Sequence, residues 1–256
     1  MFLSKYKIKI KKKFFDLLVF FVEKNIKFFI KVANFLNNLF FNEYESLKNL
    51  REYTVSDAII DIGVEKGTPD LYRAFKDNFF LLIDPIKVDL LSEPENYLFV
   101  QEALSHNTLE TKLNIHPSGR SSLKDSIKFG SLLHVDNFET SNIKTSTLDQ
   151  IIDKHLKDYS NIGIKIDTQG SEGDILDGLE KNINKVSFII LENNIVQRYK
   201  DSDLFSKITC KLYNKNFFFL KFLNAGSVIP RYAFDCVYLP KDNPVFYSED
   251  IHKKNF

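Results

Sequence analysis

Residues 58–67 read AIIDIGVEKG, a short apolar run that closes with Asp61 and Gly63 and reaches Gly67 after three further residues. A continuous apolar run of this length is typical of a strand buried on both faces of a sheet. The glycines allow the backbone to turn sharply and to approach a ligand closely, and Pro69 then marks a helix start. This stretch therefore predicts a strand, a turn that binds a ligand, and a helix.

Apolar runs of the same kind recur along the chain and alternate with helical segments. We predict further strands at residues 79–84, 97–100, 162–167, 186–192, 217–222 and 234–239. Helices are predicted at residues 69–75, 148–156, 171–179 and 203–213, with another helical stretch directly after residue 84. Alternation of this kind is typical of a parallel sheet that helices cover on both faces.

Two segments depart from this alternation. Residues 113–115 and 134–147 are more polar and predict a hairpin or a loop insertion between the third and fourth strands. The last two strands are joined through Asn224, Gly226 and Pro230 without a helix, which favours an antiparallel hairpin at the edge of the sheet. We therefore expect an α/β fold with a Rossmann-like, doubly wound, mostly parallel seven-stranded sheet and an antiparallel C-terminal hairpin.

The N-terminal segment differs from the rest, since a run of lysines leads into Phe-rich apolar stretches. These stretches are too short to span a bilayer. Asp16 interrupts the first of them, which argues against a signal peptide. We predict a basic helical arm at residues 1–52, a domain at 53–245 and a tail at 246–256. The arm either docks peripherally on an anionic membrane surface or packs against the domain or a second subunit, and we prefer the second interpretation.

The composition argues against several classes of protein. With 35 basic and 34 acidic residues among 256, the chain lacks the net basic charge of a dedicated nucleic-acid-binding protein. Both cysteines lie in apolar runs, which argues against a disulfide framework and fits a reducing cytoplasm. The five histidines lack the close spacing of metal ligands, so no metal is expected.

Ligand-binding residues are expected where parallel strands end. Asp84 closes the second strand, where a carboxylate can accept hydrogen bonds from both hydroxyls of a ribose. The turn at 63–67 reads G-x-x-x-G and carries Glu65 where a dinucleotide fingerprint has its middle glycine. Carboxylates at Asp61 and Glu65 disfavour a pyrophosphate and tolerate a cationic amino-acid tail. We therefore predict S-adenosylmethionine as the cofactor, with a nicotinamide dinucleotide as the alternative.

The sequence also resembles a known family. Residues 61–67, DIGVEKG, resemble the D-x-G-A-N-x-G opening of the FkbM-type methyltransferases. TLD at 147–149, followed by IKIDTQGSE at 164–172, is similar to the T-L-D and L-K-I-D-V-E-G-A-E motifs of that family. Three shorter segments also agree with it: GRSSL at 119–123, ILDG at 175–178 and IILE at 189–192. The resemblance covers about residues 58–239, which leaves out the arm and the tail.

This resemblance implies that the protein binds S-adenosylmethionine and transfers its methyl group. The implied cofactor-binding residues are Asp61, Gly63 and Gly67 at the methionine end, Asp84 at the ribose, and Glu102 and Ala103 near the adenine. The resemblance also implies that Asp167 lies beside the sulfonium and the acceptor.

Two acidic residues are candidates for catalysis. Asp167 ends the fourth predicted strand and is our first candidate for the base that takes the proton of an alcohol acceptor. Its alternative role is to cap the helix that begins near Ser171. Glu172 is predicted to orient the catalytic residue, or else to complement the dipole of that helix from its first turn.

We therefore expect an S-adenosylmethionine-dependent O-methyltransferase that acts on a hydroxyl of a glycan or a small-molecule metabolite. The chain departs from the family motif at Val64 and Glu65, which replace Ala-Asn, and at Thr168 and Gln169, which replace Val-Glu. Because Gln169 lacks a carboxylate, a non-catalytic binding or assembly module stays open as an alternative. An NAD-dependent oxidoreductase is a less favoured alternative, and the sequence leaves the oligomeric state open.

Overall fold

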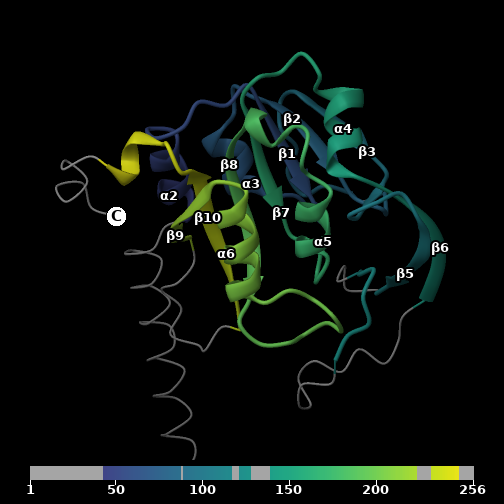
Figure 1. The fold of residues 1–256 in the computed structure, drawn as a ribbon. Coiled ribbons are helices and arrows are strands. Elements are labelled where there is room, and N and C mark those ends of the chain that lie inside the picture. The colour runs from purple at the N-terminus through teal and green to yellow at the C-terminus, as the bar shows by residue number, and fades with distance from the viewer. Residues whose placement is uncertain (1–42, 88, 117–120, 128–138, 224–231, 248–256) are drawn as a thin grey trace, which may run out of the picture. The chain divides into compact units, whose positions relative to one another are not determined.

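Helices and strands follow one another nearly as the sequence predicts. The computed structural model describes residues 43–247 except 88, 117–120, 128–138 and 224–231, and Figure 1 shows how these elements are arranged. Seven strands of this part form one sheet in the order β3-β2-β1-β7-β8-β10-β9. Their bounds are Ala58–Ile62 for β1, Phe79–Ile83 for β2, Tyr97–Val100 for β3, Ile162–Ile166 for β7, Val186–Asn194 for β8, Phe217–Phe222 for β9 and Ala233–Pro240 for β10.

This sheet is parallel from β3 to β8 and antiparallel at β10 and β9. β1 and β7 are buried along their whole length, because both consist largely of isoleucine and lie between two layers of helices. β10 lies between β8 and β9, so the C-terminal hairpin extends the parallel part at one edge. The predicted Rossmann-like, doubly wound, mostly parallel sheet is confirmed.

The order of the strands reverses between β1 and β7. These two strands are neighbours although they lie far apart in the sequence, with Asp61 opposite Lys165 and Ile62 opposite Ile166. From β1 the chain continues outward through β2 to β3, and from β7 it continues in the other direction to β8. Sheets of this kind bind ligands at the carboxyl ends of the strands beside such a reversal.

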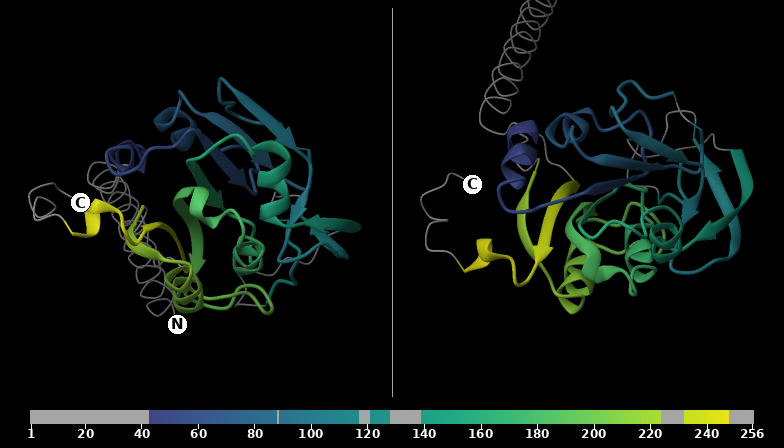
Figure 2. Two further views of the ribbon diagram at one scale, coloured as in Figure 1. Left: turned by 45° about the horizontal axis from the view of Figure 1, so that its top comes forward. Right: turned by 90° about the horizontal axis from the view of Figure 1, so that it is seen from above.

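Helices cover both faces of the sheet, as the right-hand view of Figure 2 shows. They are α2 (Glu43–Leu50), α3 (Pro69–Ala74), α4 (Leu148–His155), α5 (Glu172–Asp177) and α6 (Phe205–Asn214), with short 3₁₀ helices at Ile183–Lys185 and Pro244–Phe246. α2 and α3 pack on one face, where Leu47 and Phe75 are buried. α4, α5 and α6 pack on the other face through residues such as Ile152, Leu176 and Leu212.

The insertion predicted between the third and fourth strands forms a small second sheet. Its order is β4-β6-β5, with β4 at Ala103–Leu104, β5 at Glu110–Ile115 and β6 at Glu139–Ser146. β5 and β6 pair antiparallel as a hairpin, and β4 joins β6 in parallel. Figure 1 shows this hairpin beside β3, beyond the carboxyl edge of the main sheet.

The helical stretch predicted after residue 84 is wrong. Residues 85–96, of which 88 is not described, contain no helix and connect β2 to β3 as an irregular segment. Pro85 and Pro94 restrict the backbone at both ends of this segment. Its middle is held by a hydrogen bond from the Leu91 N–H to the Lys66 carbonyl, so the segment covers the glycine turn after β1.

Most of the predicted N-terminal arm lies outside the described residues. Residues 43–50, which the sequence analysis assigned to the arm, form α2, and the buried Leu47 and Leu50 pack it into the domain. The predictions for residues 1–42, including membrane docking, therefore stay predictions, as does that for the tail at 248–256. None of the helices in the described part of the chain combines the length and apolar character needed to cross a membrane.

Candidate functional site

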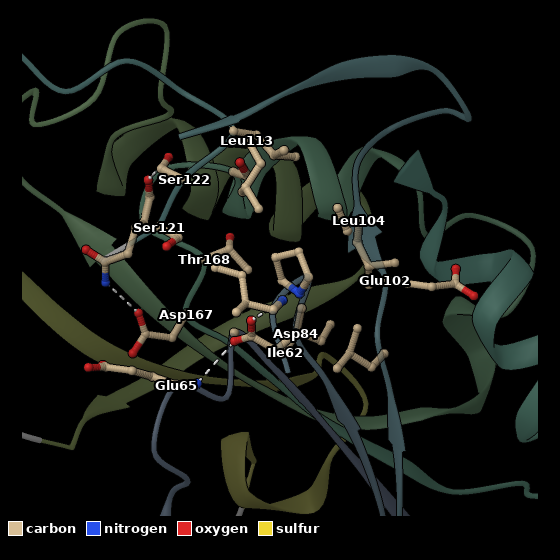
Figure 3. Close-up of a pocket in the computed structure, with 18 of the residues that line it drawn as sticks. Ile62, Glu65, Asp84, Glu102, Leu104, Leu113, Ser121, Ser122, Asp167 and Thr168 are labelled. Atoms are coloured by element: carbon tan, nitrogen blue, oxygen red, sulfur yellow. Dashed lines mark hydrogen bonds between the residues drawn. The ribbon is translucent and has the colours of Figure 1, made fainter. Parts of the chain in front are cut away.

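A cavity of about 270 Å³ opens at the carboxyl ends of β1, β2 and β7, beside the reversal in strand order. Figure 3 shows side chains that line it. Its apolar lining consists of Ile62, Ile83, Ile86, Leu104, Leu113 and Ile115, which come from the strand ends and from the small second sheet. Its polar lining includes Asp84, Asp167, Ser121 and Ser122.

The turn after β1 lies directly against the end of β7. Gly63 has a φ of 78°, in the left-handed region, and a Cβ added there would lie 1.9 Å from the Asp167 carbonyl oxygen. Only glycine permits this contact between the two backbones. Gly63 lines the cavity, whereas Gly67 packs against Tyr72 and Ser92 and does not line it. The predicted contacts of both glycines with the methionine end of the cofactor stay predictions.

Asp84 stands at the end of β2 with its carboxylate in the cavity. One oxygen accepts a hydrogen bond from the Glu65 N–H at 3.2 Å and the other from the Ile86 N–H at 2.9 Å; Figure 3 draws both. Burial raises the pKa of Asp84, and the backbone N–H groups only partly offset this effect. A carboxylate has about four acceptor positions, so two remain for the hydroxyls of a ribose.

The two residues predicted near the adenine also line the cavity. Ala103 lies in β4 and is almost fully buried. The carboxylate of Glu102 forms an ion pair with Lys154 of α4 at 3.3 Å, and Figure 3 shows this side chain directed away from Asp84. The backbone of Glu102 is therefore closer to the cavity centre than its charge.

Asp61 is fully buried and lies behind the turn instead of in the cavity. Its carboxylate accepts hydrogen bonds from the hydroxyls of Tyr72 at 2.8 Å and Thr68 at 3.0 Å. The ammonium of Lys165 lies 3.8 Å from its other oxygen. Burial and the charge of Asp61 raise the pKa of Tyr72, so this hydroxyl stays a donor. Asp61 therefore supports the turn, and direct binding of a cofactor stays a prediction.

Asp167 lines the cavity at the end of β7, and 31% of its side chain is exposed. Its Oδ1 accepts a hydrogen bond from Gln169 Nε2 at 3.0 Å, and its Oδ2 lies 3.5 Å from Lys165 Nζ. The residue at the N-terminus of α5 is Ser171, which makes no capping hydrogen bond with its side chain. The capping role considered for Asp167 is not seen, and its carboxylate is available to a ligand.

Glu172 lies beneath the loop that follows β7 and does not line the cavity. Its carboxylate accepts hydrogen bonds from the N–H groups of Thr168 and Gly170, each at 3.0 Å. Burial raises the pKa of Glu172, while the N–H groups act in the opposite direction. This position suits the predicted orienting role, since Glu172 shapes the loop that carries Asp167, and the role stays a prediction.

Two residues without a role predicted from the sequence, Lys165 and Tyr199, also contribute to the site. Lys165 is buried between Asp61 and Asp167, and Tyr199 donates a hydrogen bond to Gln169. Lys165 on β7 and Asp167 directly after it are two residues apart, a spacing that places both side chains on one face of the sheet and is a signal readable in the sequence. No comparable signal marks Tyr199, which lies beyond β8.

Glu192 also faces this group of charges. It lies opposite Asp235 in the pairing of β8 with β10, and its carboxylate lies 3.9 Å from the Arg198 guanidinium. Burial, together with the charges of Asp167, Glu172 and Asp235, raises the pKa of Glu192 to about 8. The carboxyl edge of the sheet thus carries more carboxylates than cations, which suits a cationic ligand.

These residues fit S-adenosylmethionine better than a dinucleotide. The Glu65 N–H, which a dinucleotide turn would direct at a phosphate, is already bonded to Asp84. The carboxylates of Asp84 and Asp167 in the cavity would repel a pyrophosphate, whereas they attract a sulfonium. The apolar side chains beside Asp84 offer a surface for an adenine ring.

The chain is similar to several known proteins. The Methyltransferase FkbM domain matches residues 37–219, and no curated protein matches the chain. The fold is similar to that of magnesium protoporphyrin IX methyltransferase from Synechocystis, solved with S-adenosylmethionine bound, at 10% identity, a TM-score of 0.40, and coverage of 82% of this chain and 81% of that one. It is also similar to 1,6-didemethyltoxoflavin-N1-methyltransferase from Burkholderia thailandensis, at 7% identity, a TM-score of 0.40, and coverage of 85% and 90%.

The family match covers well over half of the chain, includes every strand from β1 to β8, and ends within β9. It therefore agrees with the motifs at residues 61–67 and 164–172, which carry the turn and the loop that border the cavity. The chain belongs to the FkbM family of methyltransferases and is an S-adenosylmethionine-dependent methyltransferase.

Proposed function

We propose that this methyltransferase acts on a hydroxyl oxygen of a glycan or a small-molecule metabolite, with Asp167 as the base. The observation that carries the proposal is the carboxylate of Asp167. It is partly exposed in the cavity, and it is held by Gln169 and Lys165 without being consumed as a helix cap. A carboxylate in this state can accept a proton from an acceptor that enters beside it.

The chemistry of the acceptor explains why a base is needed. When bound, S-adenosylmethionine supplies an electrophilic methyl group. A hydroxyl is a weak nucleophile until its proton is removed, and a positioned base contributes typically 10²–10⁴-fold to the rate. Asp167 takes that proton at its carboxylate, and the loop held by Glu172 keeps the carboxylate at the end of β7.

The cofactor binds on the side of the cavity formed by Asp84 and the apolar residues, away from Asp167. Asp84 accepts the ribose hydroxyls, and Ile83, Leu104 and Leu113 form an apolar wall for the adenine. Gly63 lets the turn lie against the Asp167 backbone, since any side chain there would collide with it, and this turn binds the methionine end. The cofactor would thus lie across the ends of β1 and β2, with its reactive end toward Asp167.

Transfer of a labelled methyl group tests the proposed reaction. The purified protein is incubated with methyl-labelled S-adenosylmethionine and an extract of glycans and metabolites, and the labelled product is analysed by mass spectrometry and NMR. We expect a methyl ether, which resists mild alkali. Label on a nitrogen, or on a carboxylate as an alkali-labile ester, would contradict methylation of a hydroxyl. Binding of the cofactor without any transfer would favour a non-catalytic module.

Asp84→Asn is expected to weaken binding of S-adenosylhomocysteine roughly tenfold or more at neutral pH. Losing hydrogen bonds to a charged acceptor costs about 1.5–3 kcal/mol. Because burial raises the pKa of Asp84, the wild-type affinity should fall as the pH decreases, and at a higher pH than for an ordinary aspartate. The variant should lack this dependence.

Calorimetric titration at several pH values measures both effects. NAD, titrated in parallel, is expected not to bind, and NAD binding would revive the oxidoreductase alternative. Asp153→Asn, which removes a carboxylate exposed on α4, serves as the matched control and should bind like the wild type. If Asp84→Asn and the wild type bind S-adenosylhomocysteine equally well, Asp84 does not hold the ribose hydroxyls.

A further inference from the structure

Gln169 connects three separate parts of the chain at the edge of the cavity. Its Nε2 donates to Asp167 Oδ1 at 3.0 Å, its Oε1 accepts from the Tyr199 hydroxyl at 2.6 Å, and its backbone carbonyl accepts from Ser122 Oγ at 2.7 Å. Its φ of 56° lies in the left-handed region, which costs free energy for a residue other than glycine. The three contacts hold it in this conformation.

The orientation of the Gln169 amide follows from its partners. A carboxylate only accepts hydrogen bonds, so the NH₂ group must face Asp167. The amide oxygen then faces Tyr199, whose hydroxyl donates to it. A glutamate at this position, as in the family motif, would instead set two carboxylates against each other. With glutamine at this position, the side chain instead donates a hydrogen bond to the Asp167 carboxylate.

Tyr199 is a rigid anchor for that amide. Only 6% of the residue is exposed, and its side chain packs so closely on Gly170 that a Cβ there would lie 2.7 Å from it. The backbone of Tyr199 pairs with Ser126, and its carbonyl accepts hydrogen bonds from Gln197 and Ser202. The hydroxyl therefore has little freedom to leave Gln169.

Asp167 needs such a donor because several charges surround it. The carboxylates of Glu172 on α5 and Glu192 on β8 repel the charge of Asp167. Lys165 attracts that charge, but it is shared with Asp61 of β1 and also interacts with Asp235 of β10. Gln169 adds a neutral donor on the side that Lys165 does not cover.

We propose that Gln169 is a positioning residue that, anchored by Tyr199 and Ser122, orients the Asp167 carboxylate toward the reacting atoms. The glutamine is thus a working part of this site and not a sign of lost activity. This inference rests on the proposed function, because it takes Asp167 as the group that faces the transferred methyl.

Sinefungin tests the inference without a known acceptor. This analogue carries an amine at the place of the sulfonium methyl of S-adenosylmethionine, whereas S-adenosylhomocysteine has neither group. The ratio of the affinities for sinefungin and S-adenosylhomocysteine, measured by calorimetry, therefore reports how strongly the Asp167 carboxylate binds a group at the place of the transferred methyl. Interactions that both ligands share, and losses of stability that affect both, cancel in this ratio.

We expect the wild type to prefer sinefungin, and Asp167→Asn to lose most of that preference. Gln169→Met, which keeps the length of the side chain but cannot donate, should lower the preference roughly tenfold, as expected for one lost hydrogen bond to a charged group. Tyr199→Phe should lower it less, since the amide stays but loses its anchor. Affinity for S-adenosylhomocysteine should change little in all three variants.

The outcomes separate the two proposals. If Asp167→Asn keeps the preference for sinefungin, the proposed place of Asp167 in the reaction is wrong, and this inference is lost with it. If Asp167→Asn loses the preference while Gln169→Met and Tyr199→Phe keep it, only the positioning role is wrong. Should Gln169→Met fail to fold, Tyr199→Phe, which retains the packing of the ring on Gly170, decides the question.

Discussion

Asp167→Asn is expected to lower the rate of methyl transfer by roughly 10²–10⁴-fold, the usual contribution of a positioned base. Asparagine has the same shape as aspartate, and it can still accept the hydrogen bond from Gln169 through its amide oxygen. Lys165 keeps its second partner, Asp61, so the variant should fold. What it loses is the ability to take a proton.

Initial rates with methyl-labelled S-adenosylmethionine measure this effect, using the acceptor that the labelling experiment identifies. Titration with S-adenosylhomocysteine should show an affinity within a few-fold of the wild type, which separates a loss of chemistry from a loss of binding. Asp153→Asn is the matched control, because it makes the same chemical change at an exposed site on α4. A rate within threefold of the wild type would mean that another group takes the proton.

Lys165→Met is expected to destabilise the protein by about 3–5 kcal/mol, because breaking a buried ion pair leaves uncompensated charge. Lys165 is 8% exposed and Asp61 is fully buried, with Lys165 Nζ 3.8 Å from Asp61 Oδ1 and 3.5 Å from Asp167 Oδ2. Methionine fills a similar volume without a charge. Asp61 would then keep a buried negative charge with no cation beside it.

The pKa of Lys165 supports this expectation. Burial by itself would lower that pKa, but the carboxylates of Asp167 and Asp61 outweigh burial and raise it. A lysine whose pKa is raised on folding contributes stability that is fully present below its unfolded pKa and is lost only as the pH rises through the folded value. The difference in stability between wild type and variant should therefore be present throughout the neutral range.

Urea unfolding measures the difference, and a second substitution tests its cause. Lys165→Met combined with Asp61→Asn should be more stable than Lys165→Met alone, because it removes the carboxylate left without a cation. Lys181→Met, at an exposed ion pair with Asp153, should leave the stability nearly unchanged. If Lys165→Met proved as stable as the wild type, the charges at this edge would have to be solvated by water.

The predictions of secondary structure succeeded where the chain carries continuous apolar runs. Ile59, Ile60 and Ile62 in β1, and the isoleucines of β7, leave no alternative to a strand covered on both faces. The prediction failed after β2, where a helix was expected. There Pro85 and Pro94 restrict the backbone, and the contact of Leu91 with Lys66 is a tertiary one that no local pattern contains.

The predicted site residues lie partly in the cavity, for the same reason, and their roles stay predictions. Asp84 and Asp167 lie in the cavity because the carboxyl ends of parallel strands meet at one edge of a sheet. Asp61 belongs to the same motif as Gly63, yet it does not line the cavity. Asp61 lies within β1, one residue before the strand ends, and the hydroxyls of Thr68 and Tyr72 enclose its carboxylate through hydrogen bonds. A motif shows which residues are near one another, and not which of them neighbouring side chains will enclose.

The amino-acid sequence by itself determined which segments become strands, that these strands run mostly parallel, and that Asp84 and Asp167 stand at their carboxyl ends. These properties follow from local composition and from the period of two along a strand. Only the tertiary structure decided that Tyr199 and Ser122 hold Gln169, and that Lys165 is buried among Asp61, Asp167 and Glu192. Such contacts depend on strand order and loop packing, which are set by the free energy of the whole core and leave no repeat in the sequence.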